Sequence, residues 1–259
     1  MRTKILIDSS IAFVVATTVE MTLHECGHFV ATLAMGGQAI LHHNYVEHND
    51  VSDAARCMSA LAGPVVSLVI GLVFQLVVSS RRFKSMTALT LQYLSIFGYI
   101  GFFGYVMIAP FFSYGDMGFV LRYIGCPMWL IFLLAALAGV ALFFLGKAWS
   151  VHFIGMMSRA TASDLKTRRQ FIYSLVFFPL FVGIAITTLL NFPVPTPLSL
   201  IAPLTSPFVI LWPFGYYLRG TAIYYDEEES IGKKIYIGGI VALIMLIVIN
   251  RLLVGGFGG

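Results

Sequence analysis

The stretch Met21–Gly37, MTLHECGHFVATLAMGG, sets three ionisable side chains into a long apolar run of the sequence. At its centre, His24, Glu25 and His28 form an H-E-x-x-H pattern. Residues four apart share one face of a helix, so the two histidines can bind one metal ion together. Glu25 lies beside them and can act as general base on a water at the metal. Because ionisable groups are costly in a membrane helix, the pattern indicates a hydrolytic metal site at or within a membrane; two unrelated histidines are the alternative.

The composition of the chain is that of a membrane protein. Of its 259 residues, 59% are hydrophobic and 11% are charged, whereas about a quarter of the residues in a soluble domain are charged. The apolar runs recur from one end of the sequence to the other, which excludes a soluble protein with one anchor. We therefore predict an all-α, polytopic bundle of membrane helices, with residues 1–259 forming a single integral membrane domain.

Seven apolar segments approach the length of about 20 residues that a helix needs to cross a bilayer. They are Ile5–Met35, Met58–Val78, Met86–Phe112, Met128–Ser150, Phe171–Leu190, Leu198–Tyr217 and Ile235–Leu253. The first has no cleavage site before His24, so we expect a retained span rather than a signal peptide. The sixth contains Pro203, Pro207 and Pro213, which predict a kinked or broken helix.

The segment between the first two spans differs from the rest of the chain. It begins with Gly36-Gly37 and is polar and rich in histidine. Its length suits a short polar loop or a β-hairpin after the first helix. The side chains in it that could bind a metal are His42, His43, His48, Asp50 and Asp53.

The Lys and Arg residues are divided unequally between the two sides that seven spans define. With the N-terminus in the cytoplasm, the outer side holds only Arg56, Arg122 and Arg251, so 13 of the 16 are cytoplasmic. Those 13 are Arg2, Lys4, Arg81, Arg82, Lys84, Lys147, Arg159, Lys166, Arg168, Arg169, Arg219, Lys233 and Lys234. The positive-inside rule favours this orientation, which puts the H-E-x-x-H pattern near the outer face.

The sequence gives little support to other kinds of site. Its three cysteines, Cys26, Cys57 and Cys126, are far apart and odd in number, so we predict neither a disulfide framework nor a thiolate zinc site. The net charge of +4 comes mostly from loops, and no basic patch interleaved with aromatic residues predicts nucleic-acid binding. A membrane di-iron centre would need more ligands than 6 His residues easily provide.

A catalytic zinc usually has three protein ligands, so the two histidines leave one ligand to be found. Topology favours Asp116, at the end of the third span and on the same side of the membrane as His24 and His28. Because glycines flank it closely, Asp116 can equally be a turn or N-cap residue. The histidines and aspartates of the first loop remain alternative ligands, whereas His152 falls on the opposite side and is discounted.

Three motifs follow one another in the first half of the chain. The first is HECGH at 24–28, followed by the Gly-Gly break and the polar loop. The second is Ala62-Gly63-Pro64, with Ser67 where an asparagine is often found, and the third is Asp116, which follows a proline-containing helix end and precedes Met117 rather than glycine. Together they resemble the site-2-protease-type intramembrane zinc metalloproteases, as a divergent member. The resemblance covers about residues 5–130, the metalloprotease-like core, and 131–259 would add further transmembrane helices.

The resemblance implies a zinc endopeptidase that cleaves transmembrane or juxtamembrane segments of membrane proteins. In that role His24, His28 and Asp116 bind Zn²⁺, and Glu25 activates the water. It also implies a multi-pass protein of the cell's inner membrane, whose partners are the lipid bilayer and membrane-protein substrates with a transmembrane helix. Bacterial members of the family direct the site toward the cytoplasm, whereas the charge count directs it outward, and the sequence leaves both orientations open.

Two supporting features and one alternative function complete the expectations. Glu20 lies one turn before His24 and can accept a hydrogen bond from the ring nitrogen that does not bind metal; a water-contacting carboxylate is the alternative. Small residues around Gly63 and Pro64 would let the second span approach the first closely. The alternative function is a non-catalytic polytopic protein, a transporter or scaffold that keeps a metal site, and the prolines of the sixth span are compatible with a transporter's broken helix.

Overall fold

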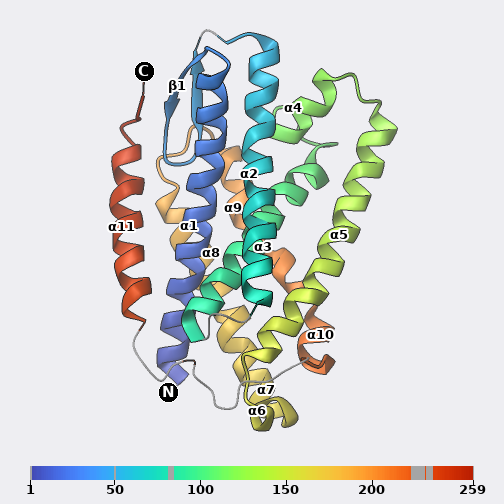
Figure 1. The fold of residues 1–259 in the computed structure, drawn as a ribbon, viewed down its shortest axis with the longest axis vertical. Coiled ribbons are helices and arrows are strands. Elements are labelled where there is room, and N and C mark those ends of the chain that lie inside the picture. Colours follow the sequence, from blue (N-terminus) through green and yellow to red (C-terminus); the bar gives the residue numbers. More distant parts are fainter. Residues whose placement is uncertain (1, 50, 81–84, 223–230, 232–235, 259) are drawn as a thin grey trace.

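The computed structural model describes residues 2–49, 51–80, 85–222, 231 and 236–258, and it is mostly helical (Figure 1). Its longer helices are α1 (Arg2–Ala34), α2 (Asp53–Ser79), α3 (Ser85–Ile108), α5 (Met128–Gly155), α8 (Phe178–Leu190) and α11 (Ile237–Leu253). Its shorter helices are α4 (Asp116–Tyr123), α6 (Arg159–Ser163), α7 (Leu165–Ile172), α9 (Ile201–Thr205) and α10 (Phe214–Arg219). Asp50 and the basic residues Arg81, Arg82, Lys84, Lys233 and Lys234 lie outside the described residues.

The helical bundle that we predicted is confirmed. Six helical segments in the described part of the chain are long and apolar enough to cross a membrane. They are Thr3–Ala34, Asp53–Ser79, Met86–Ile108, Met128–Gly155, Leu165–Leu190 and Ile201–Arg219. The seventh predicted span corresponds to α11, which is apolar but shorter than these six. These features fit a multi-pass membrane protein.

Helix α1 lies at the centre of the bundle and packs against α2, α3, α8 and α11. In its first half, Phe13 is fully buried and meets the rings of Tyr93 and Phe97 from α3 edge-on. By contrast, only 22% of the most apolar window of α5 is buried, so most of that helix is left to face lipid. The site-bearing helix is therefore held on several sides by protein.

Small residues bring the first three helices into close contact. A Cβ at Gly27 of α1 would lie 3.1 Å from the Ala62 carbonyl oxygen and 3.2 Å from the Gly63 Cα of α2. A Cβ at Gly98 of α3 would overlap the backbone nitrogen of Gly71 in α2. The close approach that we predicted for the second span is thus present, and α2 approaches the backbone of both α1 and α3 closely.

Two of the proline-containing segments depart from regular α-helix. The predicted break in the sixth span is confirmed, because α9 and α10 are separated by the 3₁₀ segment Ser206–Leu211. Between α7 and α8 the chain forms a π-helical turn, Tyr173–Phe177. Pro179 has no N–H to give to the carbonyl four residues earlier, and the hydroxyl of Tyr93 donates to that carbonyl, of Leu175, instead.

A β-hairpin follows α1. It is one of the two structures that the sequence predicted for the first loop. Strands β1 (Gln38–Leu41) and β2 (Val46–Asn49) pair antiparallel, with Leu41 opposite Val46. The outer edge of β1 bonds to the end of the chain, because Leu41 and Phe257 exchange two backbone hydrogen bonds of 2.8 and 2.9 Å. Phe257 also contacts the ring of Phe29 on α1.

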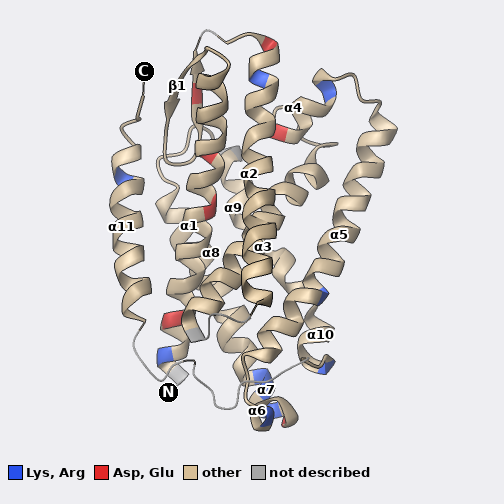
Figure 2. Cartoon of the chain, in the orientation of Figure 1, with Lys and Arg blue, Asp and Glu red and all other residues tan. Residues whose placement is uncertain are grey.

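Basic side chains gather at one end of the molecule (Figure 2). This end, at the bottom of the view, holds the start of α1, the helices α6 and α7, and α10. The opposite end holds the hairpin, the start of α2 and α4, and carries more of the acidic side chains. The described residues thus keep the charge asymmetry that the sequence suggested.

Candidate metal centre

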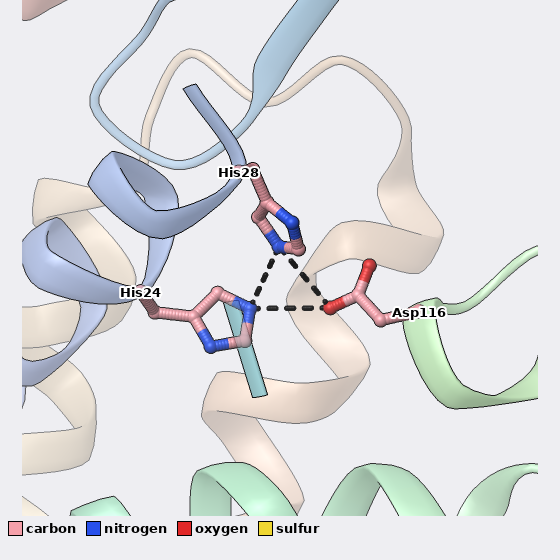
Figure 3. A group of neighbouring side chains, drawn as sticks. All are labelled: His24, His28 and Asp116. Carbon is pink, nitrogen blue, oxygen red and sulfur yellow. Dashed lines mark hydrogen bonds and ion pairs between the residues drawn. The ribbon is translucent and has the colours of Figure 1, made fainter. Parts of the chain in front are cut away.

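His24 and His28 of α1 and Asp116 of α4 converge on one point (Figure 3). The two Nε2 atoms are 3.0 Å apart. The Asp116 Oδ2 atom lies 3.1 Å from His24 Nε2 and 3.3 Å from His28 Nε2. Both histidines are buried, and the carboxylate side chain keeps 22% of its surface exposed. Ninety-two positions separate Asp116 from His24 in the chain, so tertiary packing alone brings them together.

The turn between α3 and α4 holds Asp116 in place. A Cβ at Gly118 would overlap the Phe112 carbonyl oxygen, so only glycine fits where the chain folds back on itself. Arg122 then secures the turn, because its guanidinium donates to the carbonyls of Ala109, Pro110 and Gly118 at 2.9–3.1 Å. Sequence reasoning missed this role of Arg122; a lone arginine shortly after the predicted ligand was the available signal.

The alternative role of Asp116 as a helix cap is not what the structure shows. Gly115 occupies the N-cap position of α4, and no side-chain hydrogen bond caps the helix. Asp116 is the first helical residue, and its Oδ2 atom is directed to the two histidines. Its position in the first turn also places a negative charge at the favourable end of the helix dipole.

The remaining nitrogen of His24 belongs to a relay of hydrogen bonds. His24 Nδ1 lies 2.9 Å from the Ser67 hydroxyl, which donates to Glu20 Oε1 at 2.6 Å. One of the two roles considered for Glu20 was a direct hydrogen bond from His24; the structure instead links them through the hydroxyl of Ser67 on α2. The Ser67 hydroxyl donates its hydrogen bond to the carboxylate, so it accepts one from His24 Nδ1–H. In the neutral ring, His24 Nε2 then carries a lone pair.

His28 is fixed in the same way by the backbone. Its Nδ1 atom lies 2.7 Å from the carbonyl oxygen of Ser59, which can only accept, so Nδ1 carries the proton. The Nε2 lone pair of a neutral His28 then faces that of His24 and the carboxylate of Asp116. With both rings neutral, three acceptors meet with no donor among them, an arrangement that either a bound cation or a proton on one ring would stabilise.

The spacing of these atoms fits a tetrahedral metal ion. When a zinc ion binds two ligand atoms at about 2.0–2.1 Å and at the tetrahedral angle, those two atoms lie about 3.3 Å apart. The three distances among His24 Nε2, His28 Nε2 and Asp116 Oδ2 run from 3.0 to 3.3 Å. Two imidazoles and one carboxylate are a ligand set that catalytic zinc uses, with a fourth position left for water or substrate. The donor set and its geometry therefore fit Zn²⁺.

Neighbouring residues shape the space around the ligands. A Cβ at Gly63 would overlap His28 Nε2 and lie 2.8 Å from His24 Nε2, so the absence of a side chain at 63 leaves space beside the two nitrogens that could bind a metal ion. The ring of Tyr105 stacks on His24, with centroids 5.3 Å apart and an angle of 15° between the planes. Sequence reasoning did not find Tyr105, because one tyrosine among many in an apolar helix carries no signal.

Glu25, the predicted general base, follows His24 on α1 and is 9% exposed. It lies within electrostatic range of His24, His28 and Asp116. Its carboxylate is thus next to the ligand group without being one of its three members.

The other predicted ligands do not join this group. His42 stacks on Tyr45, His43 Nε2 lies 2.9 Å from the Asn191 carbonyl oxygen, and His48 Nδ1 lies 3.0 Å from the Thr32 hydroxyl. His152 lies near the C-terminal end of α2, where its Nε2 is 3.4 Å from the Ser79 hydroxyl. Asp53 begins α2, and within the described ranges the triad is the one group of three such residues close enough to share a metal.

Outside the spanning helices, three of these groups have shifted pKa values. Burial raises the pKa of the Asp116 carboxyl, but the positive charge of His28 in its protonated form and the hydrogen bonds with both site histidines outweigh burial, so the pKa lies below its usual value. Burial lowers the pKa of His43 and of His48, and the charges of His28 and Arg56 lower that of His48 further. Asp116 is therefore a carboxylate at neutral pH, and the two hairpin histidines are neutral.

No family model, no curated protein and no solved structure matches this chain. The chemistry that the site can perform therefore has to be inferred from its own residues and geometry.

Proposed function

We propose that this protein is a zinc-dependent endopeptidase that cleaves peptide bonds within or next to the transmembrane segments of other membrane proteins. The observation that carries the proposal is the meeting of three ligand atoms, from His24, His28 and Asp116, at 3.0–3.3 Å inside a bundle of apolar helices. The proposal extends the resemblance to site-2-protease-type metalloproteases, which rests on the motifs of the first half of the chain.

The ligand set and the residue beside it support hydrolysis. Zinc bound here would polarise the scissile carbonyl and lower the pKa of a coordinated water to about 7. Glu25 takes a proton from the attacking water and passes it to the amine of the departing peptide. The Ser67–Glu20 relay and the Ser59 carbonyl hold the two imidazoles in the tautomer that leaves Nε2 unprotonated.

The surroundings of the site support a membrane-embedded substrate. The ligand histidines are buried in α1, and Asp116, at the end of the hydrophobic α3–α4 turn, is the member that keeps an exposed surface. A substrate peptide bond would approach from that side. A regular helix satisfies its own carbonyls, so the segment to be cut must unwind locally.

We also propose the finer topology. α11 serves as a seventh crossing, the basic end with α6 and α7 lies in the cytoplasm, and the protein is in the cell's inner membrane. The charge asymmetry of Figure 2 supports this orientation. Cysteine accessibility labelling at either end of the bundle tests it, and labelling of the α6–α7 end from outside intact cells would reverse it.

The decisive experiment compares membrane proteomes of cells that express the wild type, Glu25→Gln or Glu47→Gln. New protein N-termini within or beside transmembrane segments should appear with the wild type. Glu25→Gln should reduce them by about 10²–10⁴-fold, the usual contribution of a general base, while one zinc per purified protein is retained. Glu47, an exposed hairpin glutamate with 51% of its side chain accessible, is the matched control and should leave cleavage unchanged.

Two outcomes would contradict the proposal. Equal cleavage by Glu25→Gln and wild type would remove Glu25 from the chemistry. Bound zinc with no new N-termini in any sample would favour the alternative of a non-catalytic membrane protein that keeps a metal site.

A further inference from the structure

A groove of about 430 Å³ lies at the basic end of the bundle, away from the metal centre. It is formed where the start of α1 meets α7 and the π-helical turn that follows. Its lining residues are Leu6, Arg169, Gln170, Tyr173 and Ser174. The groove thus combines one positively charged side chain with an aromatic ring, an aliphatic side chain and two uncharged polar side chains.

The two neighbouring arginines of α7 differ in what they bind. Arg168 is buried, and its Nε donates to the Tyr217 carbonyl at 2.8 Å, which ties α7 to α10. Arg169 is exposed, and within the described part of the chain its guanidinium has no hydrogen-bond or ion-pair partner. A guanidinium has five N–H donors arranged in a planar fork. Among the described residues, Arg169 therefore presents an unpaired anion-binding group at the groove.

The backbone carbonyl oxygens of Gln170 and Ser174, close to Arg169, already accept hydrogen bonds from other side chains. The π-helical turn leaves the Ser174 carbonyl without a regular α-helical partner, and the Ser9 hydroxyl of α1 donates to it at 2.7 Å. The Ser174 hydroxyl in turn donates to the Gln170 carbonyl at 2.9 Å. The carbonyl oxygens of Ser174 and Gln170 thus have partners within the protein, and neither one takes up the donors of the Arg169 guanidinium.

The groove lies at the beginning of an apolar helical segment that is long enough to cross a membrane. α7 begins the span Leu165–Leu190, so Arg169 and Tyr173 lie in its first turns. Tyr173 is 54% exposed, with its ring stacked on Phe177. Tyrosine at this level places its ring against acyl chains and its hydroxyl among headgroups, and basic residues there attract anionic lipid.

We propose that this groove binds the headgroup phosphate of an anionic phospholipid. The Arg169 guanidinium donates two parallel hydrogen bonds to the phosphate, and the Tyr173 hydroxyl donates a third. Leu6 and the Tyr173 ring contact the glycerol and the first acyl carbons. The bound lipid bridges α1, which carries the candidate metal ligands farther along, to α7. This inference does not depend on the proposed proteolysis.

The test is native mass spectrometry of the purified protein in detergent with added phosphatidylglycerol or phosphatidylcholine. The wild type should retain one phosphatidylglycerol in preference to phosphatidylcholine. Arg169→Ala should weaken this binding at least about tenfold, as expected when a charged hydrogen-bonding group is lost. Arg159→Ala, which removes an exposed charge from α6 at the same end, is the matched control and should bind like the wild type.

Three results would overturn the proposal. One is equal weakening by Arg169→Ala and Arg159→Ala, which would mean diffuse attraction to a basic surface. Another is wild-type affinity in Arg169→Ala. The third is equal retention of both lipids together with displacement by inorganic phosphate alone, which would mean a phosphate site without lipid selectivity. Arg169→Lys, which keeps the charge but not the fork, should give intermediate affinity, and a thermal unfolding scan of each variant checks folding.

Discussion

The histidines of α1 and those of the β-hairpin are similarly dense in the sequence but very different in the structure. His24 and His28 direct their Nε2 atoms to one point, where Asp116 joins them. His42, His43 and His48 lie within seven positions, yet each takes a separate partner: an aromatic ring, a backbone carbonyl and a hydroxyl.

What separates the two groups is the direction of their lone pairs. In the α1 pair, the Ser59 carbonyl and the Ser67 hydroxyl accept hydrogen bonds from Nδ1–H, which leaves the Nε2 lone pairs of the neutral rings facing a carboxylate. In the hairpin, His42 and His43 lie in the connection after β1 and His48 lies in β2, and each side chain meets a different neighbour rather than a shared point. A group of potential ligands becomes a metal site only when its outer hydrogen bonds orient every lone pair toward the same point.

The largest effect should come from removing a ligand of the convergent group. Asp116→Ala should abolish stoichiometric zinc binding, because it takes away one of three ligands and leaves two neutral imidazoles. The loss should exceed the roughly 10–100-fold that removing an outer partner of a metal ligand costs. Elemental analysis of the purified protein in detergent measures it.

The hairpin supplies the control for this comparison. His43→Ala removes a buried imidazole and its hydrogen bond to Asn191, so it should lower the free energy of unfolding by about 1 kcal/mol. It should leave the zinc content unchanged. Full zinc content in Asp116→Ala, or loss of zinc in His43→Ala, would mean that the metal is held elsewhere.

A smaller but still large effect should follow from adding one methyl group. In Gly63→Ala the new Cβ would overlap His28 Nε2, so zinc affinity should fall severely although all three ligands are present. Gly104→Ala on α3 is the matched control, since its Cβ would meet only Ile100 Cγ2 at 3.7 Å, an ordinary contact. Isothermal titration with zinc distinguishes the two; equal affinities would show that the ligands can rearrange around the methyl group.

The smallest of the three effects should come from the relay behind His24. Ser67→Ala breaks the link from Nδ1 to Glu20 and should weaken zinc about 10–100-fold. Ser79→Ala, farther along the same helix, removes a hydroxyl whose contacts are no shorter than 3.4 Å and should have no effect on zinc. If Ser67→Ala binds zinc as tightly as the wild type, the relay does not orient His24.

Much of the fold and the centre of the site could be predicted from the sequence, because these parts depend on local pattern. Apolar runs long enough to span a bilayer marked the helices, prolines marked the broken span, and the i, i+4 spacing marked His24 and His28. Topology narrowed the search for a third ligand to Asp116, although it left the hairpin residues open.

The parts that escaped prediction depend on contacts between distant segments. Ser67 lies 47 positions from Glu20, and no local pattern shows that a hydroxyl of α2 stands between two side chains of α1. The role of Arg122 requires the turn after α3 to be folded first. The pairing of Phe257 with Leu41 joins the end of β1 to a segment that follows the last helix and has no signal in hydropathy.

The lack of a side chain at Gly63 also limits which substitutions the site can tolerate over evolution. Every amino acid that one nucleotide change can substitute for a glycine has a Cβ atom. At position 63 that atom would occupy the space beside both ligand nitrogens, so no missense step from this codon leaves the site as it is. Lineages that need the metal should keep glycine at 63, and a lineage that no longer needs it should lose that glycine as readily as a ligand itself.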